Sequence, residues 1–233
     1  MITLAVIPAR AGSKTIPGKN IKVIAGKPMI GWTITAALEA QGLDRVIVST
    51  DSAVIAETAL TFGAEVPFLR PEEIAQYDTP GIEPILHAVR WLDQKEGYKP
   101  DYVMYLQPTS PLRTSLDIDA VINLAMEKDA DSVISVVPAD HHPNWMQVVD
   151  EEGRLRDFMA GGSSINKRQD MNPVYALNGA VYLIRRTELL KKKSLFVKNT
   201  ERLVITPLVF PQYFLAKFLF GYNVHTLISR ASL

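Results

Sequence analysis

The stretch TLAVIPARAGSKTIPGKN, from Thr3 to Asn20, decides how the rest of the chain is read. It begins as an apolar run of strand length and passes directly into a loop of small residues that carries Arg10, Lys14 and Lys19. Small residues let backbone N–H groups approach an anion, while arginine can donate paired hydrogen bonds to phosphate oxygens and lysine adds a mobile charge. The loop therefore predicts a polyphosphate site after a buried strand, with a solvated basic turn as the alternative.

Other familiar site motifs are missing from the sequence. The loop has neither the G-x-G-x-x-G fingerprint of dinucleotide binding nor the G-x-x-x-x-G-K motif of P-loop proteins. The chain has no cysteine and no G-x-S-x-G elbow, so no thiol or serine nucleophile is indicated. His141 and His142 are adjacent and cannot easily turn both rings to one metal, so a zinc site is not expected.

Beyond this stretch, apolar runs of strand length alternate with segments of helical spacing. Strands are predicted at 45–50, 102–106, 132–137 and 178–184, and helices at 29–38, 53–62, 83–95 and 117–128. This alternation predicts an α/β fold of three layers, in which helices cover both faces of a mainly parallel sheet.

Three polar loops follow predicted strands, and in open sheets of this kind such loops converge on a ligand crevice. They are the basic loop, the segment STDS at 49–52, and LQPTSPLRT at 106–114. The last loop offers Gln107 and Arg113 as hydrogen-bonding groups between two prolines that restrict its backbone. Its alternative interpretation is an ordinary turn in which Thr114 or Ser115 caps the next helix.

The overall composition limits partners and location. Lysine plus arginine and aspartate plus glutamate balance at 25 each, so no basic field for nucleic acid is present. The lack of cysteine and of an N-terminal basic and apolar leader predicts a cytoplasmic protein. Residues 203–222 are apolar, but Pro207, Pro211, Gln212 and Lys217 interrupt them, so no membrane span is expected.

The 233 residues are enough for one main domain with an excursion. Between residues 140 and 177 the pattern weakens, with turns expected at Glu152-Gly153 and Gly161-Gly162. We therefore predict an α/β domain formed by residues 1–139 and 178–233, with an inserted hairpin-rich lobe at 140–177.

Six separate motifs together resemble one enzyme family. They are IPARAGSKTIPGKN, VIVSTDS, LRPEEIA, LQPTSPLRT, DHHP and NGAVYLI. Their order and spacing are similar to those of the acylneuraminate cytidylyltransferases, the CMP-sialic acid synthetases, a group that includes the legionaminate and pseudaminate cytidylyltransferases. The resemblance covers roughly residues 1–205, and Asn20 after Lys19 is similar to the neuraminate branch.

The resemblance implies a reaction, a fold and a partner. Enzymes of this family couple CTP to a nine-carbon 2-keto sugar acid and release pyrophosphate. They do so on a Rossmann-like three-layer α/β/α nucleotide-diphospho-sugar transferase fold, and they form homodimers through an extended lobe. The sequence leaves open whether the acid is N-acetylneuraminate, legionaminate or pseudaminate.

The family's functional positions can be carried over residue by residue. By resemblance, the CTP phosphates and ribose are held by Arg10, Ser13, Lys14 and Asn20, with Arg70 and the loop after Thr79 completing the nucleotide site. The resemblance gives Arg10, Lys19 and Gln107 the catalytic positions.

A second group of positions faces the sugar acid. By resemblance, Gln107 contacts the acid, Arg168 receives its carboxylate, and Asn178 lies near the acyl group. Tyr182 and Phe196 match aromatic positions at the sugar pocket, and Phe196 would reach it from the dimer partner.

The end of the chain departs from the family. Family members carry the pattern Ser-x-Asp-x-Asp there, and its two aspartates bind Mg²⁺, but this chain has no aspartate after Asp170. A reading-frame shift or natural divergence would each produce this change, and the metal ligands are unknown, with Asp51 the first candidate. Two hypotheses follow: an active cytidylyltransferase, or a CTP-binding homologue with weak or no catalysis.

Overall fold

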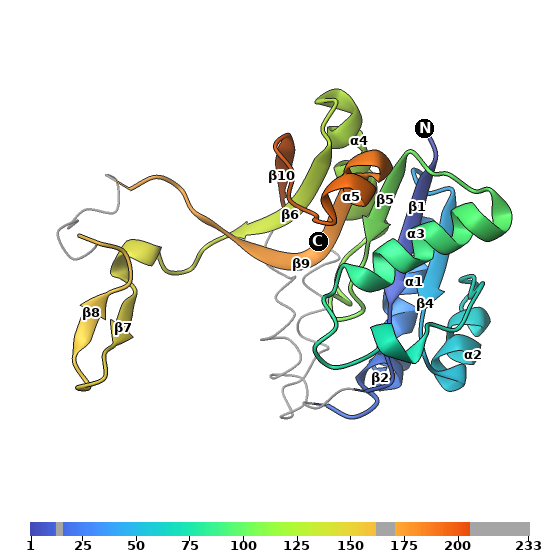
Figure 1. The fold of residues 1–233 in the computed structure, drawn as a ribbon, viewed down its shortest axis with the longest axis horizontal. Helices are drawn as coiled ribbons and strands as arrows, with labels where there is room; N and C mark the ends of the chain where they lie inside the picture. Colours follow the sequence, from blue (N-terminus) through green and yellow to red (C-terminus); the bar gives the residue numbers. More distant parts are fainter. Residues whose placement is uncertain (13–15, 162–170, 206–233) are drawn as a thin grey trace.

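The computed structural model describes residues 1–12, 16–161 and 171–205, and these fold around a six-stranded sheet. In spatial order the strands are β10 (Thr200–Val204), β6 (Ser132–Pro138), β9 (Tyr175–Arg185), β5 (Tyr102–Tyr105), β1 (Thr3–Pro8) and β4 (Arg45–Ser49). Strand β9 is antiparallel to both of its neighbours, whereas the other pairings are parallel (Figure 1). The prediction of a mainly parallel sheet is confirmed.

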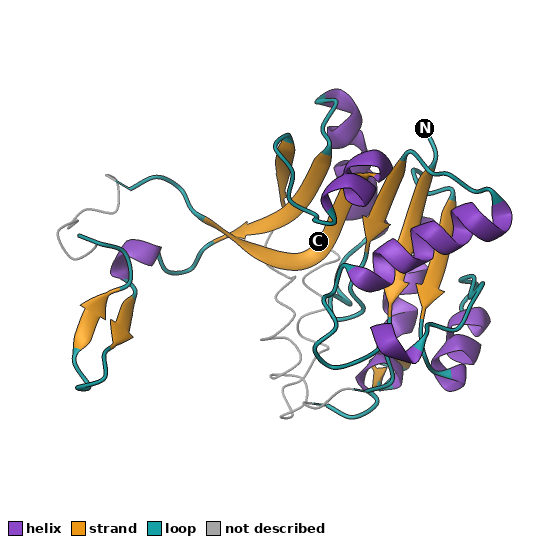
Figure 2. Ribbon diagram, viewed as in Figure 1, coloured by secondary structure: helices purple, strands orange, loops and turns teal. Residues whose placement is uncertain are grey.

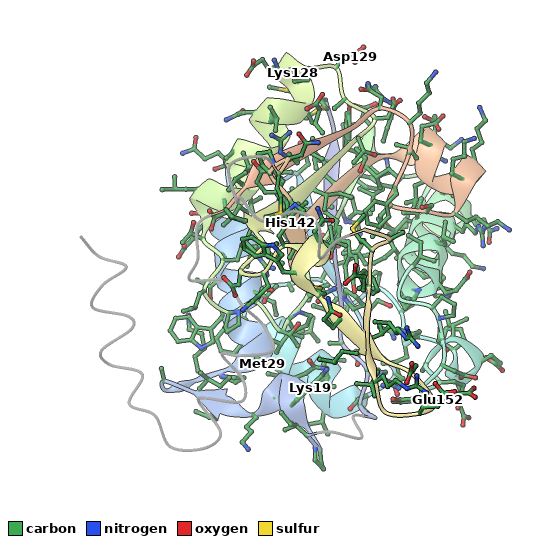
Figure 3. All side chains as sticks on the ribbon, turned by 90° about the vertical axis from the view of Figure 1, so that its left-hand side faces the viewer. Lys19, Met29, Lys128, Asp129, His142 and Glu152 are labelled. Carbon is green, nitrogen blue, oxygen red and sulfur yellow. The ribbon has the colours of Figure 1, made fainter. Side chains whose placement is uncertain are left out.

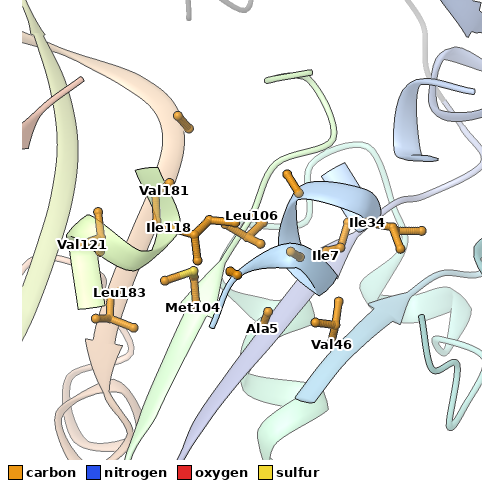
Figure 4. Packing of buried hydrophobic residues seen from close by; sticks show 14 of the residues in the cluster. Ala5, Ile7, Ile34, Val46, Met104, Leu106, Ile118, Val121, Val181 and Leu183 are labelled. Carbon is orange, nitrogen blue, oxygen red and sulfur yellow. The ribbon is translucent and has the colours of Figure 1, made fainter. Parts of the chain in front are cut away.

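Helices cover both faces of the sheet, which gives the three predicted layers (Figure 2). Helices α1 (Met29–Glu39), α2 (Ala53–Thr61) and α4 (Ser115–Glu127) pack on the face that receives Ala5 and Ile7 of β1. Helices α3 (Glu83–Glu96) and α5 (Arg186–Lys192) pack on the face that receives Leu4 and Val6. Because neighbouring residues of a strand point to opposite faces, the apolar run from Leu4 to Ile7 in β1 serves both cores. Figure 4 shows the first core, where Ile7 and Met104 of the sheet meet Ile34 and Ile118 of the helices.

Local capping explains where two of the helices begin. The Ser52 hydroxyl caps α2, because it accepts a hydrogen bond from Ile55 N at 3.4 Å. For α4, Thr114 rather than Ser115 is the cap, and its amide donates to Asp117 Oδ2 at 2.8 Å in a reciprocal capping box. The helix therefore begins two residues before the predicted start at residue 117.

The chain from 140 onward leaves the sheet and forms a hairpin of β7 (Gln147–Val149) and β8 (Leu155–Asp157). The hairpin stands apart from the sheet and its helices in Figures 1 and 2. The turn predicted at Glu152-Gly153 is present, since Gly153 has a φ of 76° and donates to Asp150 O. The second predicted turn includes Gly162, which lies outside the described residues.

Strand β9 brings the chain back to the sheet earlier than predicted. It begins at Tyr175 rather than residue 178, and Tyr175 to Leu177 pair with Pro138 to Val136 of β6. The domain limits at 139 and 178 stay a prediction. Within the described residues, no helix has the length and apolar character needed to cross a bilayer, and most of the apolar segment 203–222 lies outside them.

Candidate active site

A pocket opens where β1 and β5 end, at the edge of the sheet predicted to hold the ligand. Figure 3 shows Lys19 and Met29 at this end of the molecule and Lys128 and Asp129 at the opposite end. The pocket is lined by Pro8, Arg10, Lys19, Asn20, Arg70, Ile74, Thr79, Gly81, Pro84, Tyr105, Gln107, Pro108 and Thr109. Its volume of about 210 Å³ is below the roughly 300 Å³ at which typical ligand pockets start, so a nucleotide would extend beyond it.

Two hydrogen bonds, one on each side, hold the loop after β1 in place. Asn20 is buried in the short 3-10 turn Lys19–Ile21, and its Nδ2 donates to Arg10 O at 3.0 Å. On the other side, Ala11 N donates to Asp51 Oδ1 at 2.8 Å, which links the loop to the end of β4. The Arg10 guanidinium lies 5.4 Å from the centre of the Tyr77 ring. These contacts fix the backbone at Arg10 where its side chain enters the pocket.

Arg70 forms a second charged wall of the pocket, although it is only 5% exposed. Its Nε donates to Ser49 Oγ at 3.0 Å, its Nη2 donates to Ser49 O, and its backbone N donates to Thr50 O at 2.7 Å. Burial lowers the pKa of Arg70 to about 10, while Asp51 and Tyr105 act in the opposite direction. Burial disfavours the charged form of Arg70, and its serine partner carries no charge to offset this. An anion bound in the pocket would therefore stabilise the charged guanidinium.

Lys19 and Arg10 add to this positive field. Burial lowers the pKa of Lys19, and repulsion from Arg10 lowers it further. Repulsion from Arg10 also acts on Arg70. Because Arg10 disfavours the charged forms of both Lys19 and Arg70, a polyanion bound among these cations would be favoured, as predicted for the basic loop.

Gln107 forms the opposite wall. Its Oε1 accepts a hydrogen bond from Thr109 Oγ1 at 3.3 Å. A Cβ atom added to Gly179, which has a φ of 71°, would come within 3.0 Å of Gln107 Oε1. The carboxamide therefore lies directly over the backbone of β9. Tyr105 stacks on Tyr182 with ring centres 5.5 Å apart and an interplanar angle of 22°, and burial raises the pKa of both phenols.

Asn178 is 2% exposed and is held inside the sheet rather than on the pocket surface. Its Oδ1 accepts hydrogen bonds from Ser135 Oγ at 2.6 Å and from Ala180 N at 3.0 Å. Ser135 Oγ in turn accepts from Val181 N at 2.8 Å, at the point where the register of β6 and β9 shifts. Among the described residues, the Asn178 Nδ2 group has no hydrogen-bond partner.

The structure brings together six of the residues predicted for the site: Arg10, Lys19, Asn20, Arg70, Thr79 and Gln107. Tyr182 adjoins this group through Tyr105, and Phe196 is an exposed residue between α5 and β10. Ser13, Lys14 and Arg168 lie outside the described residues. The roles assigned to all of these positions stay predictions.

Sequence reasoning missed Tyr105 and Ser135. Tyr105 lies two residues before Gln107, so strand alternation could have placed both side chains on the same side. Ser135 is one small residue in an apolar strand, and nothing in its neighbours signals the bulge that it fills.

The described residues do not by themselves form a metal centre. They contain no group of three or more histidine, aspartate or glutamate side chains able to hold a metal ion. Asp51, the first candidate, uses Oδ1 to accept from Ala11 N. Its visible role is therefore to hold the basic loop, and the described residues offer no all-protein metal centre beside it.

Comparison with known proteins places the chain in a family. A family model described as cytidylyltransferase matches residues 4–205. The chain belongs to this cytidylyltransferase family. The match ends at the residue where the resemblance seen in the sequence ends.

Individual relatives agree with the family match. The chain is 37% identical over 206 residues to the CMP-N,N'-diacetyllegionaminic acid synthase of Legionella pneumophila, covering 88% of this chain and 87% of that protein. It is 34% identical over 207 residues to an N-acylneuraminate cytidylyltransferase of Streptococcus agalactiae, covering 86% of this chain but only 47% of the streptococcal protein. These matches confirm the resemblance to the acylneuraminate cytidylyltransferases.

The fold is also found among solved structures. A CMP:2-keto-3-deoxy-manno-octonic acid synthetase complexed with CTP superposes with a TM-score of 0.69 at 19% identity, covering 99% of this chain and all of that one. At this identity the likeness shows the fold alone, which is the predicted nucleotidyltransferase architecture.

Proposed function

We propose that this protein transfers CMP from CTP to a nine-carbon 2-keto sugar acid and releases pyrophosphate. The observation that carries the proposal is the joint placement of Arg10, Asn20, Arg70 and Gln107 around one pocket at the carboxyl ends of β1 and β5. The names of the relatives, which act on legionaminic and acylneuraminic acids, support the choice of substrate.

The cationic side of the pocket is assigned to CTP. Arg10, Lys19 and Arg70 would neutralise the triphosphate, with Ser13 and Lys14 of the same loop adding to them. Asn20 would act by holding the backbone at Arg10 through its 3.0 Å hydrogen bond, and Thr79, which lines the pocket, would help to complete the nucleotide site. Positive charge at this place supports a ligand with several negative charges.

The neutral side is assigned to the sugar acid. Gln107 offers a carboxamide to the sugar hydroxyls, and next to it the Tyr105 ring, with Tyr182 stacked on it, provides a flat wall. Asn178 would act from beneath, since its oxygen is already used within the sheet. Arg168 is assigned the sugar carboxylate because of its match to the family position.

The reaction needs no covalent intermediate. The anomeric hydroxyl attacks the α-phosphorus and a new P–O bond forms, while the bond to the bridging oxygen of pyrophosphate breaks and the electron pair leaves with pyrophosphate. The proton of the hydroxyl passes to water. Arg10 and Lys19 would stabilise the negative charge that moves to the leaving pyrophosphate. Gln107 would hold the anomeric hydroxyl of the sugar acid in line with the bond that breaks. Positioning and charge neutralisation can together supply most of the acceleration in such transfers.

By resemblance to the family, the reaction would also use Mg²⁺. When bound, Mg²⁺ offsets phosphate charge that repels the attacking hydroxyl. The alternative function, a CTP-binding homologue with weak or no catalysis, rests on the missing aspartate pair after Asp170.

A pyrophosphate-release assay tests the proposed function. The protein is incubated with CTP or ATP and with N-acetylneuraminate, legionaminate or pseudaminate, and the CMP-sugar is identified by mass spectrometry. Release of pyrophosphate that needs both CTP and one of the acids supports the proposal. CTP binding without turnover supports the alternative, and the absence of both binding and turnover contradicts both.

We also propose that the protein is a cytoplasmic homodimer. The hairpin lobe exposes apolar side chains, among them Trp145, Leu155 and Phe158, with Leu155 68% exposed. Several exposed apolar side chains on a projecting lobe are typical of an interface between copies, and Phe196 would then reach the partner's sugar pocket. The cytoplasmic location is checked by fractionating cells that produce the protein.

Solution mass tests the dimer. At micromolar concentration, wild-type protein should have the mass of two chains, and Leu155→Glu with Phe158→Glu should have the mass of one. Leu116→Glu is the matched control, because Leu116 is 76% exposed on α4, away from the lobe, and should leave the mass unchanged. A wild-type protein with the mass of one chain contradicts the proposal.

A further inference from the structure

Arg113 is a buried cation whose partners are main-chain groups. It is 3% exposed, and its Nη1 donates to Ala180 O at 2.6 Å and to Gln107 O at 3.3 Å. Its Nε and Nη2 have no hydrogen-bond partner among the described residues. Burial lowers the pKa of Arg113, and Asp117, which raises it, has its Oδ2 engaged by Thr114. The guanidinium is therefore enclosed without an ion pair in the described part of the chain.

Stability alone does not explain a guanidinium at this place. A buried charge without a carboxylate partner is costly, and an apolar side chain of similar size would often be no less stable. What the guanidinium achieves is geometric: one nitrogen joins two carbonyls that are 73 residues apart in sequence, since Gln107 belongs to the loop after β5 and Ala180 to β9.

A second contact joins the same two segments. Ser110 Oγ donates to Gly179 O at 3.2 Å, next to the bond from Arg113 to Ala180. Above this junction, the Gln107 carboxamide lies over Gly179 so closely that a Cβ there would meet Oε1 at 3.0 Å. The position of the Gln107 side chain thus depends on how tightly the loop is held against β9.

We propose that Arg113 is a positioning residue that clasps the backbone of Gln107 against Ala180 of β9 and so fixes the Gln107 carboxamide in the active site. Ser110 is the second part of this clasp. The inference rests on the proposed function only in naming the sugar acid as the substrate that Gln107 contacts. The role proposed for Arg113 differs from the roles of Arg10 and Arg70, because the side chains of those two residues line the pocket itself.

The clasp is tested first without any reaction. Ser110 N donates to Gln107 O and Arg113 N donates to Ser110 O, so amide hydrogen exchange of residues 106–113 reports how firmly the loop is held. Arg113→Met should speed this exchange by about tenfold or more, and Ser110→Ala should speed it less. Tyr102→Phe is the matched control, because it removes a buried hydrogen bond to a carbonyl, Ala130 O at 2.7 Å, at the other end of β5. Equal exchange in wild type and Arg113→Met overturns the clasp.

Kinetics then test whether the clasp acts through Gln107. Arg113→Met should lower kcat/KM for the sugar acid by about tenfold or more while the Kd for CTP stays within about twofold, and Arg113→Lys should recover part of the loss. In a Gln107→Ala background, Arg113→Met should have little further effect, since the side chain that it positions is gone. Equal losses for CTP and the sugar acid, or full additivity with Gln107→Ala, overturn the positioning role.

The two proposals can fail separately. Should Arg113→Met not fold, Ser110→Ala and Arg113→Lys carry the same measurements. If the wild-type protein binds CTP but makes no CMP-sugar, the proposed function fails and the positioning role fails with it, while the exchange experiment still decides whether the clasp exists.

Discussion

The two sides of the pocket are built in different ways. On the side of β1 and β4, Arg10, Lys19 and Arg70 present charge to the pocket, and buried polar groups such as Ser49 and Asn20 hold them from behind. On the side of β5 and β9, the surface is the Gln107 carboxamide and the Tyr105 ring, which stacks on Tyr182. The cation on this side, Arg113, is enclosed and donates to the carbonyls of Gln107 and Ala180.

The difference suggests a division of tasks. Charge acts over several ångströms and tolerates small displacements, so the cationic side suits a triphosphate that every reaction shares. Carboxamide and ring contacts depend on shape and on hydrogen bonds at short range, so the neutral side suits the discrimination of sugar acids.

We expect the largest change in kcat from adding carboxylate ligands for Mg²⁺, because the described residues on the two sides of the pocket contain no metal-binding cluster. Replacing residues 209–233 with a family ending that carries the Ser-x-Asp-x-Asp pattern should raise kcat by about two orders of magnitude or more, because the added aspartates supply ligands for Mg²⁺. The Kd for CTP should change little, since the cationic side is untouched. Steady-state pyrophosphate release and calorimetry on the same two proteins measure the two quantities.

A matched control for this exchange carries the same ending with both aspartates changed to asparagine. It should leave kcat at the level of the original chain. The prediction is wrong if the original chain already turns over at roughly 1 s⁻¹ or faster, a rate typical of enzymes. Asp51→Asn would then show whether this carboxylate, which also holds Ala11 N, takes part.

The second effect isolates the neutral side. Gln107→Ala should lower kcat/KM for the sugar acid by about 100-fold, equivalent to about 2.7 kcal/mol, while the Kd for CTP stays within about twofold. Gln147→Ala removes a glutamine of the hairpin lobe that bonds Asp157 at 2.8 Å, and it should change neither value. A comparable loss of CTP affinity in Gln107→Ala would show that Gln107 belongs to the nucleotide side instead.

The sequence predicted the charged side better than the neutral one. The apolar run ending at Pro8 and the basic residues after it lie within one stretch, so local patterns sufficed to place Arg10 and Lys19 at the edge of the sheet. Each predicted strand and helix exists, because the apolar periods in this chain are long and regular. The errors lie at the ends, such as the start of α4, where Thr114 and Asp117 cap the helix earlier than its apolar pattern begins.

The neutral side depends on contacts that no local pattern contains. Arg113 bonds Ala180, and Ser135 bonds Asn178 and Val181, and each of these pairs is far apart in sequence. Their geometry follows from the antiparallel insertion of β9 between β5 and β6 and from its bulge at Ser135. A single sequence gives the residue types but not this register, so Asn178 was predicted at the site while its buried bonds were not.

The third effect returns to the cationic side. Arg10→Ala should weaken CTP binding by about tenfold or more, at least about 1.4 kcal/mol, because it removes a guanidinium that can bind two phosphate oxygens. The protein should also bind CTP in preference to ATP. Calorimetry with both nucleotides measures both effects.

Two variants control for charge alone. Arg10→Lys keeps the charge but not the paired hydrogen bonds, and it should recover only part of the affinity. Arg154→Ala removes an arginine of the exposed hairpin and should leave CTP binding unchanged. An Arg10→Ala protein with wild-type affinity would remove the loop from its proposed role.

The smallest effect is a dependence on pH that belongs to Lys19. Burial and Arg10 lower the pKa of Lys19, so it loses its charge at a lower pH than an ordinary lysine does. Bound phosphate favours the charged form, so once the pH exceeds this lowered pKa, CTP binding must take up a proton. The affinity should therefore be level below that pKa and fall by about threefold to tenfold as the pH rises through it. Lys19→Arg should remove the part of the alkaline fall that belongs to Lys19 and leave only the part from Arg70, whose pKa burial lowers to about 10. Lys22→Gln, at an exposed lysine of the same segment, should preserve the wild-type fall. Calorimetric titrations across the alkaline range decide the matter, and an identical fall in wild type and Lys19→Arg would mean that another group titrates.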